Sequence, residues 1–419
     1  MAISQAVVLA AGEGRRLRPL TYTRPKCMIP LAGKPILHHV LANLHAAGVK
    51  KAVVVVKYME EVVREYFAKL PKSELGMELE FITQGSKYGT AAAFARAAGK
   101  IDSTFFAAAG DVITTPAALE QLARAHEGKI SALLTEADKS EQYGIAKVEN
   151  GWLAGFEEKP KNAPARALAN CSLYVMEPEI FKALVAVRKS PRGEFEMTDI
   201  LKSEKVKAVI TSEYWLDMGL PWQLFDANKF LLEKTGEKKD KSQIENSTIK
   251  GKVILEPGAK ILDSYVEGPL YVGANTIIGP HAYIRGTSSI GRNCCIGDST
   301  TIKNSIIFDN VNAKHLSYIG DSIVGEGCNF GSATQIANFR FDAGSVKAKV
   351  EDVIIDTRRN KLGAIIGDGV KMGVLSSVMP GKMIGDHCWI GANVMVKENV
   401  ERNTLVELEQ KLKISKIKN

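Results

Sequence analysis

The chain has 419 residues, more than a single hydrophobic core usually supports, so two domains are expected. Apolar residues make up 45% and charged residues 24% of it, a composition typical of well-packed globular proteins. The sequence contains no apolar run of about 18 residues, which is the length needed to span a bilayer. Residues 1–4 lack a signal-peptide pattern, and we therefore expect a cytoplasmic protein without a membrane partner.

The net charge of +8 is not gathered in a basic cluster interleaved with aromatic residues, so no nucleic-acid partner is expected. Anionic small substrates, such as nucleotides and sugar phosphates, account for the excess of positive charge. The six cysteines show no C-x-x-C spacing, which argues against a zinc site and a disulfide framework. We interpret the cysteines as small buried apolar residues.

The chain opens with an apolar strand at residues 6–10, which is followed by Gly12, Gly14 and Arg16, with Lys26 further on. A strand that ends in glycines presents backbone N–H groups and cations where a triphosphate could lie. The order of residues is not that of a P-loop, and spacing alone is equally consistent with a plain turn.

Apolar runs at 52–56, 79–82 and 105–109 alternate with helical stretches at 36–47, 60–70 and 90–99. This alternation predicts βαβ units and a mostly parallel sheet, with ligands at the carboxyl ends of its strands. Asp111 follows one such strand, and Asp217 lies in a similar Trp-x-Asp-x-Gly setting. The two carboxylates could hold Mg²⁺, although an isolated Gly-Asp more often caps a turn.

Residues 7–14, Arg24-Pro25-Lys26 and residues 31–35 together resemble the signature of sugar-1-phosphate nucleotidylyltransferases, with Arg15 in place of the usual threonine. The resemblance implies a Rossmann-like α/β domain over residues 1–235. It also implies triphosphate contacts from Arg16 and Lys26, nucleotide contacts from Leu9, Ala10, Gly12, Gly14, Gln84, Gly89 and Thr90, sugar-phosphate contacts from Gly144, Glu158, Lys159 and Asn170, and Mg²⁺ ligands at Asp111 and Asp217.

In the implied reaction an oxygen of a sugar-1-phosphate attacks the α-phosphate of the nucleotide in line, and pyrophosphate leaves. Positioning and electrostatics carry such a step, and no general base is needed because the attacking phosphate is already ionised. Asn170 is followed by Cys171-Ser172, where the family has a small residue and glycine. The choice of sugar is therefore less firmly predicted than the reaction.

After a charged stretch, aliphatic residues recur at every sixth position from Val272 to Ile302 and again from Ile366 to Val396, and glycine follows most of them. This hexapeptide periodicity predicts a left-handed parallel β-helix in which the aliphatics stack into one inner column. We expect a linker at 236–245, the β-helix at 246–400 and a tail at 401–419 that is a short helix or extended. Such coils are expected to associate as a homotrimer.

Residues 315–321 interrupt the repeat and resemble the acetyltransferase segment of the bacterial N-acetylglucosamine-1-phosphate uridylyltransferase/glucosamine-1-phosphate acetyltransferases. A lone histidine is more often structural, but the resemblance implies that His315 is the general base that deprotonates an amino sugar for attack on acetyl-CoA. Further residues match this family by their offsets from His315. They are Arg285 and Lys303 for the phosphate, Tyr318 for the sugar, and Asn329 and Asn338 for the amine and acetyl group.

The segment at 339–362 departs from the bacterial pattern, and its basic part could contact the phosphates of CoA or form a solvated hairpin. The whole chain resembles the archaeal bifunctional sugar-1-phosphate nucleotidylyltransferase/acetyltransferases. This implies acetylation of glucosamine- or galactosamine-1-phosphate and then transfer of UMP from UTP, in UDP-N-acetylglucosamine biosynthesis. Two alternatives remain open, namely a monofunctional glucose- or mannose-1-phosphate nucleotidylyltransferase with a scaffolding β-helix, and a non-catalytic subunit.

Overall fold

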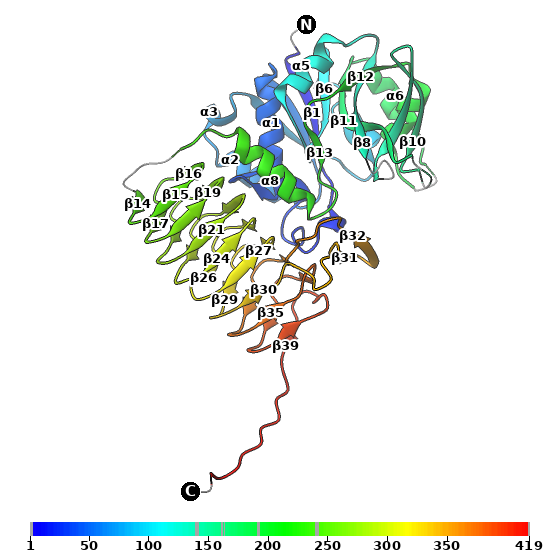
Figure 1. The fold of residues 1–419 in the computed structure, drawn as a ribbon. Coiled ribbons are helices and arrows are strands. Elements are labelled where there is room, and N and C mark those ends of the chain that lie inside the picture. The colour runs from blue at the N-terminus through cyan, green and yellow to red at the C-terminus, as the bar shows by residue number, and fades with distance from the viewer. Residues whose placement is uncertain are drawn as a thin grey trace. The chain divides into compact units, whose positions relative to one another are not determined.

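The computed structural model describes residues 3–138, 142–160, 162, 164–190, 193–238 and 243–417. The chain forms two compact units (Figure 1). The first contains Met1–Gly14, Arg24–Ile29 and Lys34–Gly219, and the second contains Arg15–Thr23, Pro30–Gly33 and Leu220–Asn419. Residues 239–242 of the expected linker and residues 418–419 of the expected tail lie outside the described residues. The domain bounds expected from the sequence stay predictions.

A mixed sheet forms the centre of the first unit within the described residues. Its strands, in spatial order, are β5 (Glu78–Thr83), β4 (Lys51–Val56), β1 (Gln5–Ala10), β6 (Phe105–Ala109), β11 (Arg166–Met176), β8 (Ile130–Asp138), β12 (Val206–Thr211), β10 (Trp152–Glu158) and β9 (Gly144–Glu149). The strands β5, β4, β1 and β6 run parallel, as the alternation of strands and helices predicts. The strand β11 is antiparallel to both β6 and β8, and β12 is again parallel to β8.

Helices cover this sheet. They are α1 (Ile36–Ala46), α2 (Glu60–Ala68), α3 (Lys72–Leu75), α4 (Thr90–Ala95), α5 (Pro116–Arg124), α6 (Ile180–Ala186) and α7 (Met197–Ser203). The ends of α1 and α2 agree to within two residues with the helices expected at 36–47 and 60–70. The helix expected at 90–99 is shorter, because turns replace it after Ala95 and Gly99 adopts a φ of +76°. Buried residues of the strands β1, β4, β6, β8, β11 and β12 pack with the inner faces of α4, α6 and α7 in an apolar core.

The second unit is a stack of short parallel strands in three sheets, which Figure 1 shows as successive rungs. The first sheet contains β14 (Ile244–Glu245), β17 (Lys260–Leu262), β20 (Ile277–Ile278), β23 (Cys295–Ile296), β26 (Asn312–Ala313), β29 (Asn329–Phe330), β34 (Lys371–Met372), β37 (Trp389–Ile390) and β39 (Leu405–Val406). The second contains β15 (Thr248–Lys250), β18 (Tyr265–Glu267), β21 (Tyr283–Arg285), β24 (Thr301–Lys303), β27 (Tyr318–Gly320), β30 (Gln335–Ile336), β35 (Ser377–Val378) and β38 (Met395–Val396). The third contains β16 (Val253–Leu255), β19 (Leu270–Val272), β22 (Ser288–Ile290), β25 (Ile306–Ile307), β28 (Ile323–Val324), β33 (Ile365–Ile366) and β36 (Met383–Ile384).

The repeated aliphatic residues lie in the interior of these coils, as a left-handed β-helix requires. They form three ladders, one on each sheet, instead of the single column expected. Val272 pairs with Ile290, Ile278 with Ile296, and Ile284 with Ile302. The reason is that successive hexapeptides fall on successive sheets, so a residue meets its equivalent only one full coil later.

Two further segments complete the second unit. Helix α8 (Gln223–Lys234) packs on it through Asn228, whose Oδ1 accepts a hydrogen bond from Ser289 Oγ at 2.7 Å. The segment at 339–362 contains an antiparallel hairpin of β31 (Lys347–Val350) and β32 (Val353–Asp356). Residues 407–417 are exposed and carry no regular structure, so the tail is extended. In the part of the chain that the structure describes, no helix has the length and hydropathy of a membrane span.

Candidate active sites

Three residues that the sequence predicts to act on the nucleotide meet in the first unit. Lys26 Nζ forms an ion pair with Asp111 and lies 3.4 Å from Asp217 Oδ1. The lysine side chain is 14% exposed, whereas the two carboxylates are 26% and 32% exposed. A mostly buried ammonium therefore lies between two carboxylates that face solvent on their other sides.

Strand pairing explains how Asp111 and Asp217 come together. Asp217 is the last residue of β13 (Trp215–Asp217), which pairs antiparallel with β7 (Val112–Thr114), and its register partner is Val112. Gly110 allows Asp111 to project at this point, because its N–H donates to Leu9 O at 2.8 Å and a Cβ there would lie only 2.6 Å from that oxygen. A side chain at position 110 would thus push the carboxylate away from β1.

The glycine-rich loop begins where β1 ends. Leu9 and Ala10 are its last strand residues, Gly12 has open space around its Cβ position, and Gly14 has a φ of +69° that favours glycine. Arg16 lies in the 3-10 turn η1 (Arg15–Leu17), and this turn belongs to the second unit. The cluster in the first unit therefore consists of Lys26, Asp111 and Asp217.

The predicted nucleobase residues lie in one loop. Gln84 is only 4% exposed, and its Nε2 donates to the carbonyl oxygens of Lys87 and Gly89 at 3.0 and 3.2 Å. These bonds fix the orientation of the amide, with Oε1 as the acceptor on its other side. Gly89 has a φ of +127° and packs against the backbone of Phe195, while Thr90 Oγ1 accepts the Met197 N–H. Gln84 also lines a cavity of about 390 Å³.

The predicted sugar-binding residues lie on β9, β10 and β11. Gly144 and Glu158 are register partners, and a Cβ on Gly144 would collide with Phe156 and with Glu158 Oε2. Lys159 Nζ lies 3.7 Å from Glu158 Oε1. Asn170 stands at an irregularity of β11 and donates to Tyr174 Oη at 2.7 Å.

The departure at Cys171-Ser172 has a structural counterpart. Ser172 adopts a φ of +55°, the region that favours the glycine of the family pattern. Its N–H donates to Asn170 Oδ1 at 3.1 Å. This hydrogen bond stabilises a backbone conformation that glycine would adopt without strain. The asparagine side chain is therefore oriented by its own turn.

A second cluster of predicted residues lies on the second sheet of the β-helix. Arg285 and Lys303 are register partners at the ends of β21 and β24, and Gly320 is the next member of that row. Tyr318 Oη accepts a hydrogen bond from Asn338 Nδ2 at 3.1 Å. Arg285 Nε is buried and has no hydrogen-bond partner among the described residues. An unsatisfied buried guanidinium nitrogen indicates a place for an acceptor such as a phosphate oxygen.

One residue of this cluster was missed by the sequence analysis. Asp321 is 5% exposed and contacts Lys303 Nζ, Asn304 Nδ2 and Asn338 Nδ2 at 2.5, 2.9 and 2.5 Å. Residues 304, 321 and 338 are each 17 positions apart, one coil of the helix. That spacing could have revealed the contact, since parallel coils place equivalent positions side by side.

His315 and Asn329 lie elsewhere on the coils. His315 is exposed at the corner between the first and second sheets, where its Nδ1 lies 3.2 Å from Asp298 Oδ2. Asn329 begins β29 on the first sheet, between Asn312 and Lys371. No contact between either residue and the Tyr318–Asn338 pair is found in the described part of the chain. Asp298 is the second residue that the sequence analysis missed.

The insert at 339–362 is built into the β-helix unit. Thr357 Oγ1 donates to Val346 O at 2.6 Å, and Arg359 forms an ion pair with Asp226 of α8 at 3.1 Å. The side chains of Val346 and Ala348 are buried. The insert is therefore an anchored hairpin with an exposed outer face, and three of its basic residues, Arg340, Lys349 and Arg359, already form ion pairs.

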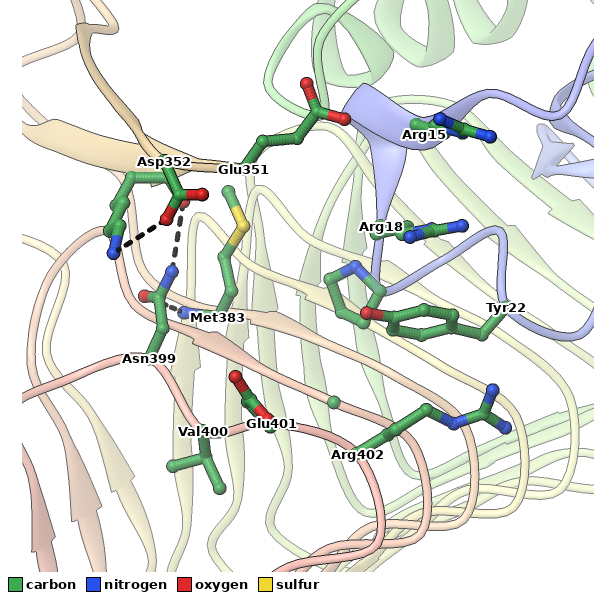
Figure 2. Close-up of a pocket in the computed structure, with 13 residues that line it drawn as sticks. Arg15, Arg18, Tyr22, Glu351, Asp352, Met383, Asn399, Val400, Glu401 and Arg402 are labelled. Atoms are coloured by element: carbon green, nitrogen blue, oxygen red, sulfur yellow. Dashed lines mark hydrogen bonds and ion pairs between the residues drawn. The ribbon is translucent and has the colours of Figure 1, made fainter.

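A cavity of about 450 Å³ in the second unit lies beside this hairpin (Figure 2). Arg15, Arg18 and Arg402 lie along one side, and the Tyr22 ring lies between the last two at 5.0 and 4.8 Å from their guanidinium carbons. Three carboxylates, those of Glu351, Asp352 and Glu401, also line the cavity. Arg15, which departs from the family pattern, thus lines a cavity of mixed charge that none of the predicted catalytic residues borders.

Two family models match the chain. The nucleotidyl transferase family matches residues 5–234, and the GMPPB C-terminal domain family matches residues 266–374. A solved structure of UDP-glucose pyrophosphorylase bound to UDP-glucose covers 56% of this chain and 100% of that chain, with a TM-score of 0.50 and 21% identity. This likeness concerns the fold of the first part of the chain.

Curated relatives match over the full length. The bifunctional protein GlmU of Methanocaldococcus jannaschii is 38% identical over 99% of this chain and 100% of its own length. A bifunctional sugar-1-phosphate nucleotidylyltransferase/acetyltransferase of Sulfurisphaera tokodaii is 34% identical over 94% of this chain and 98% of its own. With matches of 34–38% identity over nearly the full length of both chains, the chain belongs to the family of the archaeal bifunctional sugar-1-phosphate nucleotidylyltransferase/acetyltransferases.

Proposed function

We propose that the protein acetylates glucosamine-1-phosphate, and also galactosamine-1-phosphate, with acetyl-CoA and then transfers UMP from UTP to the N-acetylated product. The observation that carries this proposal is the full-length relationship to bifunctional relatives, in a chain with one polar cluster on each unit. Nothing in the comparisons favours a scaffolding β-helix or a non-catalytic subunit. Cytoplasmic location stays a prediction.

In the first reaction centre, Lys26 holds the triphosphate, and Gly12 and Gly14 leave room for it beside the end of β1. The triphosphate contact of Arg16 stays a prediction from the sequence. The carboxylates of Asp111 and Asp217 fit Mg²⁺, because they are oxygen ligands that already share a cation, the Lys26 ammonium. Magnesium would supply positive charge against the phosphates during transfer. Lys26 neutralises charge on the departing pyrophosphate. The sugar phosphate attacks the α-phosphate without a general base, because its own phosphate is already ionised.

The base and the sugar are held by neighbouring residues. The Gln84 amide presents Oε1 to a nucleobase N–H, with Gly89 and Thr90 shaping the loop. Glu158, Lys159 and Asn170 bind the sugar, and Gly144 leaves space beside Glu158. Contacts of this kind discriminate between bases and between sugars by only about 1–3 kcal/mol each.

In the second reaction centre, the phosphate of the amino sugar binds Arg285 and Lys303. His315 accepts a proton from the ammonium group of the sugar, and the free amine attacks the carbonyl carbon of the thioester. The C–S bond breaks, and CoA leaves as the thiol after protonation. Asp298 holds His315 Nδ1–H, so that Nε2 is the basic nitrogen. Asn338 and Asn329 position the amine and the acetyl group.

The separation of His315 and Asn329 from Tyr318 on the coil supports a homotrimer. In a cyclic trimer, the face that carries His315 in one copy would complete its site against the face that carries Tyr318 in the next copy. Light scattering coupled to size-exclusion chromatography is expected to give about three times the 45.5 kDa chain mass. A monomer with full acetyltransferase activity would contradict the shared site.

The function is tested by two assays on one preparation. Acetyl-CoA with an amino-sugar-1-phosphate is followed by free thiol, and UTP with N-acetylglucosamine-1-phosphate and Mg²⁺ is followed by pyrophosphate. His315→Ala is expected to abolish thiol release alone, and Asp111→Ala to abolish pyrophosphate release alone. If the wild-type protein released no thiol with either amino sugar, the acetyltransferase half of the proposal would be wrong.

A further inference from the structure

The carboxylate of Asp321 is the centre of the polar cluster on the second sheet. It is almost completely buried and meets three side-chain donors from neighbouring coils. Oδ1 accepts from Asn304, while Oδ2 accepts from both Lys303 and Asn338. A buried carboxylate is tolerated only where it is paired and hydrogen-bonded, and both conditions are met here.

The first consequence concerns the amide of Asn338. An ionised carboxylate only accepts hydrogen bonds, so the group that faces Asp321 must be the NH₂ of Asn338. The same nitrogen lies 3.1 Å from Tyr318 Oη, and the phenol oxygen therefore accepts. Asn338 Oδ1 is then the atom turned away from Asp321, and the Tyr318 hydroxyl hydrogen is left to donate.

The donor and acceptor atoms that Asn338 and Tyr318 present match the chemistry of an amino sugar. The Asn338 carbonyl oxygen is an acceptor for a substrate N–H, and the Tyr318 hydroxyl is a donor for a sugar or phosphate oxygen. If the amide were reversed, its NH₂ would face the amine donor and the two would repel each other. The carboxylate at position 321 thus selects the amide orientation that suits an amine.

The second consequence concerns Lys303. Its side chain is 18% exposed, and its ammonium is neutralised by Asp321, so the pair carries no net charge. Arg285, with its unsatisfied buried Nε, is then the principal cation for the phosphate. Asp321 therefore weakens phosphate binding by Lys303 while it orders the residues around the amine.

We propose that Asp321 is a positioning residue of the acetyl-transfer site, which sets the donor and acceptor pattern of Asn338 and Tyr318 for an amino-sugar phosphate. This inference rests on the proposed acetyltransferase function. Asp321 touches no reacting atom and acts through Asn338, Tyr318 and Lys303.

The test is Asp321→Asn, which keeps the size of the side chain and removes its charge. With glucosamine-1-phosphate and acetyl-CoA, kcat is expected to fall about 10- to 100-fold, because the Asn338 amide is no longer held in one orientation. The KM for the sugar phosphate is expected to fall, because the Lys303 ammonium is released to the phosphate. A purely structural role would instead lower the fraction of active protein, and with it the apparent kcat, and would leave KM unchanged.

Two controls accompany this variant. Asn304→Ala removes the donor on Oδ1 but leaves both contacts on Oδ2, and it is expected to keep near wild-type kcat. Asp309→Asn makes the same chemical change at another corner, where the carboxylate caps the Arg292 N–H at 2.7 Å, and it is expected to keep near wild-type kcat and KM. Pyrophosphate release from UTP and N-acetylglucosamine-1-phosphate is expected to be unchanged in all three variants.

The outcomes separate the two proposals. If the wild-type protein releases no thiol, the proposed acetyltransferase function is wrong, and this inference is wrong with it. An active wild type with an Asp321→Asn variant of equal kcat overturns the inference alone, as does a loss of thiol and pyrophosphate release together. If Asp321→Asn does not fold, Asn338→Leu keeps the Lys303–Asp321 pair but cannot donate, and wild-type kcat in that variant also overturns the inference.

Discussion

Lys26 Nζ lies 3.4 Å from Asp217 Oδ1, although 191 residues separate them in the chain. The same ammonium pairs with Asp111. The lysine that is predicted to contact the triphosphate therefore shares its carboxylate partners with the predicted magnesium ion. Two cations that use the same oxygens compete, and the competition can be measured.

Replacing Lys26 by Met is expected to lower kcat/KM for pyrophosphate release about 100-fold or more, since one stabilising charge is lost from the phosphates. The Mg²⁺ concentration for half-maximal activity is expected to fall, because the ammonium no longer occupies the two carboxylates. Steady-state assays across a Mg²⁺ titration measure both quantities. Lys207→Met, which breaks a pair with Glu127 at 2.8 Å, is the matched control and should change neither. A higher Mg²⁺ requirement in Lys26→Met would contradict the competition.

Gly320→Ala is expected to abolish most acetyl transfer with little loss of stability. A Cβ at this position would lie 2.6 Å from Tyr318 Oη and 2.7 Å from Asn338 Nδ2, which are the mobile ends of both side chains. They would move aside and the fold would stay intact. Thiol release and thermal unfolding measure the two effects. Gly236→Ala is the control, because no atom lies within 4 Å of its Cβ position. A variant with full activity would show that the Tyr318–Asn338 contact is dispensable.

Asp298→Asn is expected to lower kcat for acetyl transfer about tenfold, because the His315 ring loses the carboxylate, which only accepts hydrogen bonds and thereby fixes the basic nitrogen of the ring. The KM for acetyl-CoA is expected to change little. Asp263→Asn is the matched control, since the Asp263 carbonyl accepts the His281 N–H as the Asp298 carbonyl accepts the Leu316 N–H. Equal kcat in the Asp263 and Asp298 variants would rule out a role for the carboxylate.

Asp386→Asn is expected to stabilise the β-helix above pH 6 and not near pH 4. Burial, reinforced by the neighbouring Asp368, raises the pKa of Asp386 from 3.8 to about 6. The folded state thus prefers the protonated form, and the free energy of unfolding falls by about 3 kcal/mol at most as pH rises from about 4 to 6. The amide in the Asp386→Asn variant does not titrate, so the free energy of unfolding of the variant does not fall in this pH range.

Urea unfolding of both proteins at pH 4.5 and 7.5 measures the difference. The amide keeps the Oδ1 that accepts the Asp368 N–H at 3.1 Å, and it replaces Oδ2, which has no partner among the described residues. A stability difference that is the same at both pH values would show that Asp386 does not titrate between them.

Much of the architecture could be predicted from the sequence because it depends on local periodicity. The six-residue repeat of aliphatic residues determines a β-helix, since each strand of each coil buries one aliphatic residue, whatever its position along the chain. The alternation of apolar runs and helices likewise predicts βαβ units in the first unit. Lys26, Asp111 and Asp217 were all found by motif, and the structure places them in one cluster.

The polar contacts that orient these residues depend on the tertiary structure. Asp321 stands inside a recognised segment, yet its role appears only when the coils stack and bring Lys303 and Asn338 to its carboxylate. Asp298 meets His315 for the same reason. Tyr283 pairs with Thr301 after 18 residues and Thr301 pairs with Tyr318 after 17, so the register that decides these neighbours is set by the folded stack. The sequence alone thus determined the coil and predicted the reactive residues, and the stacking of coils decided which partners these residues contact.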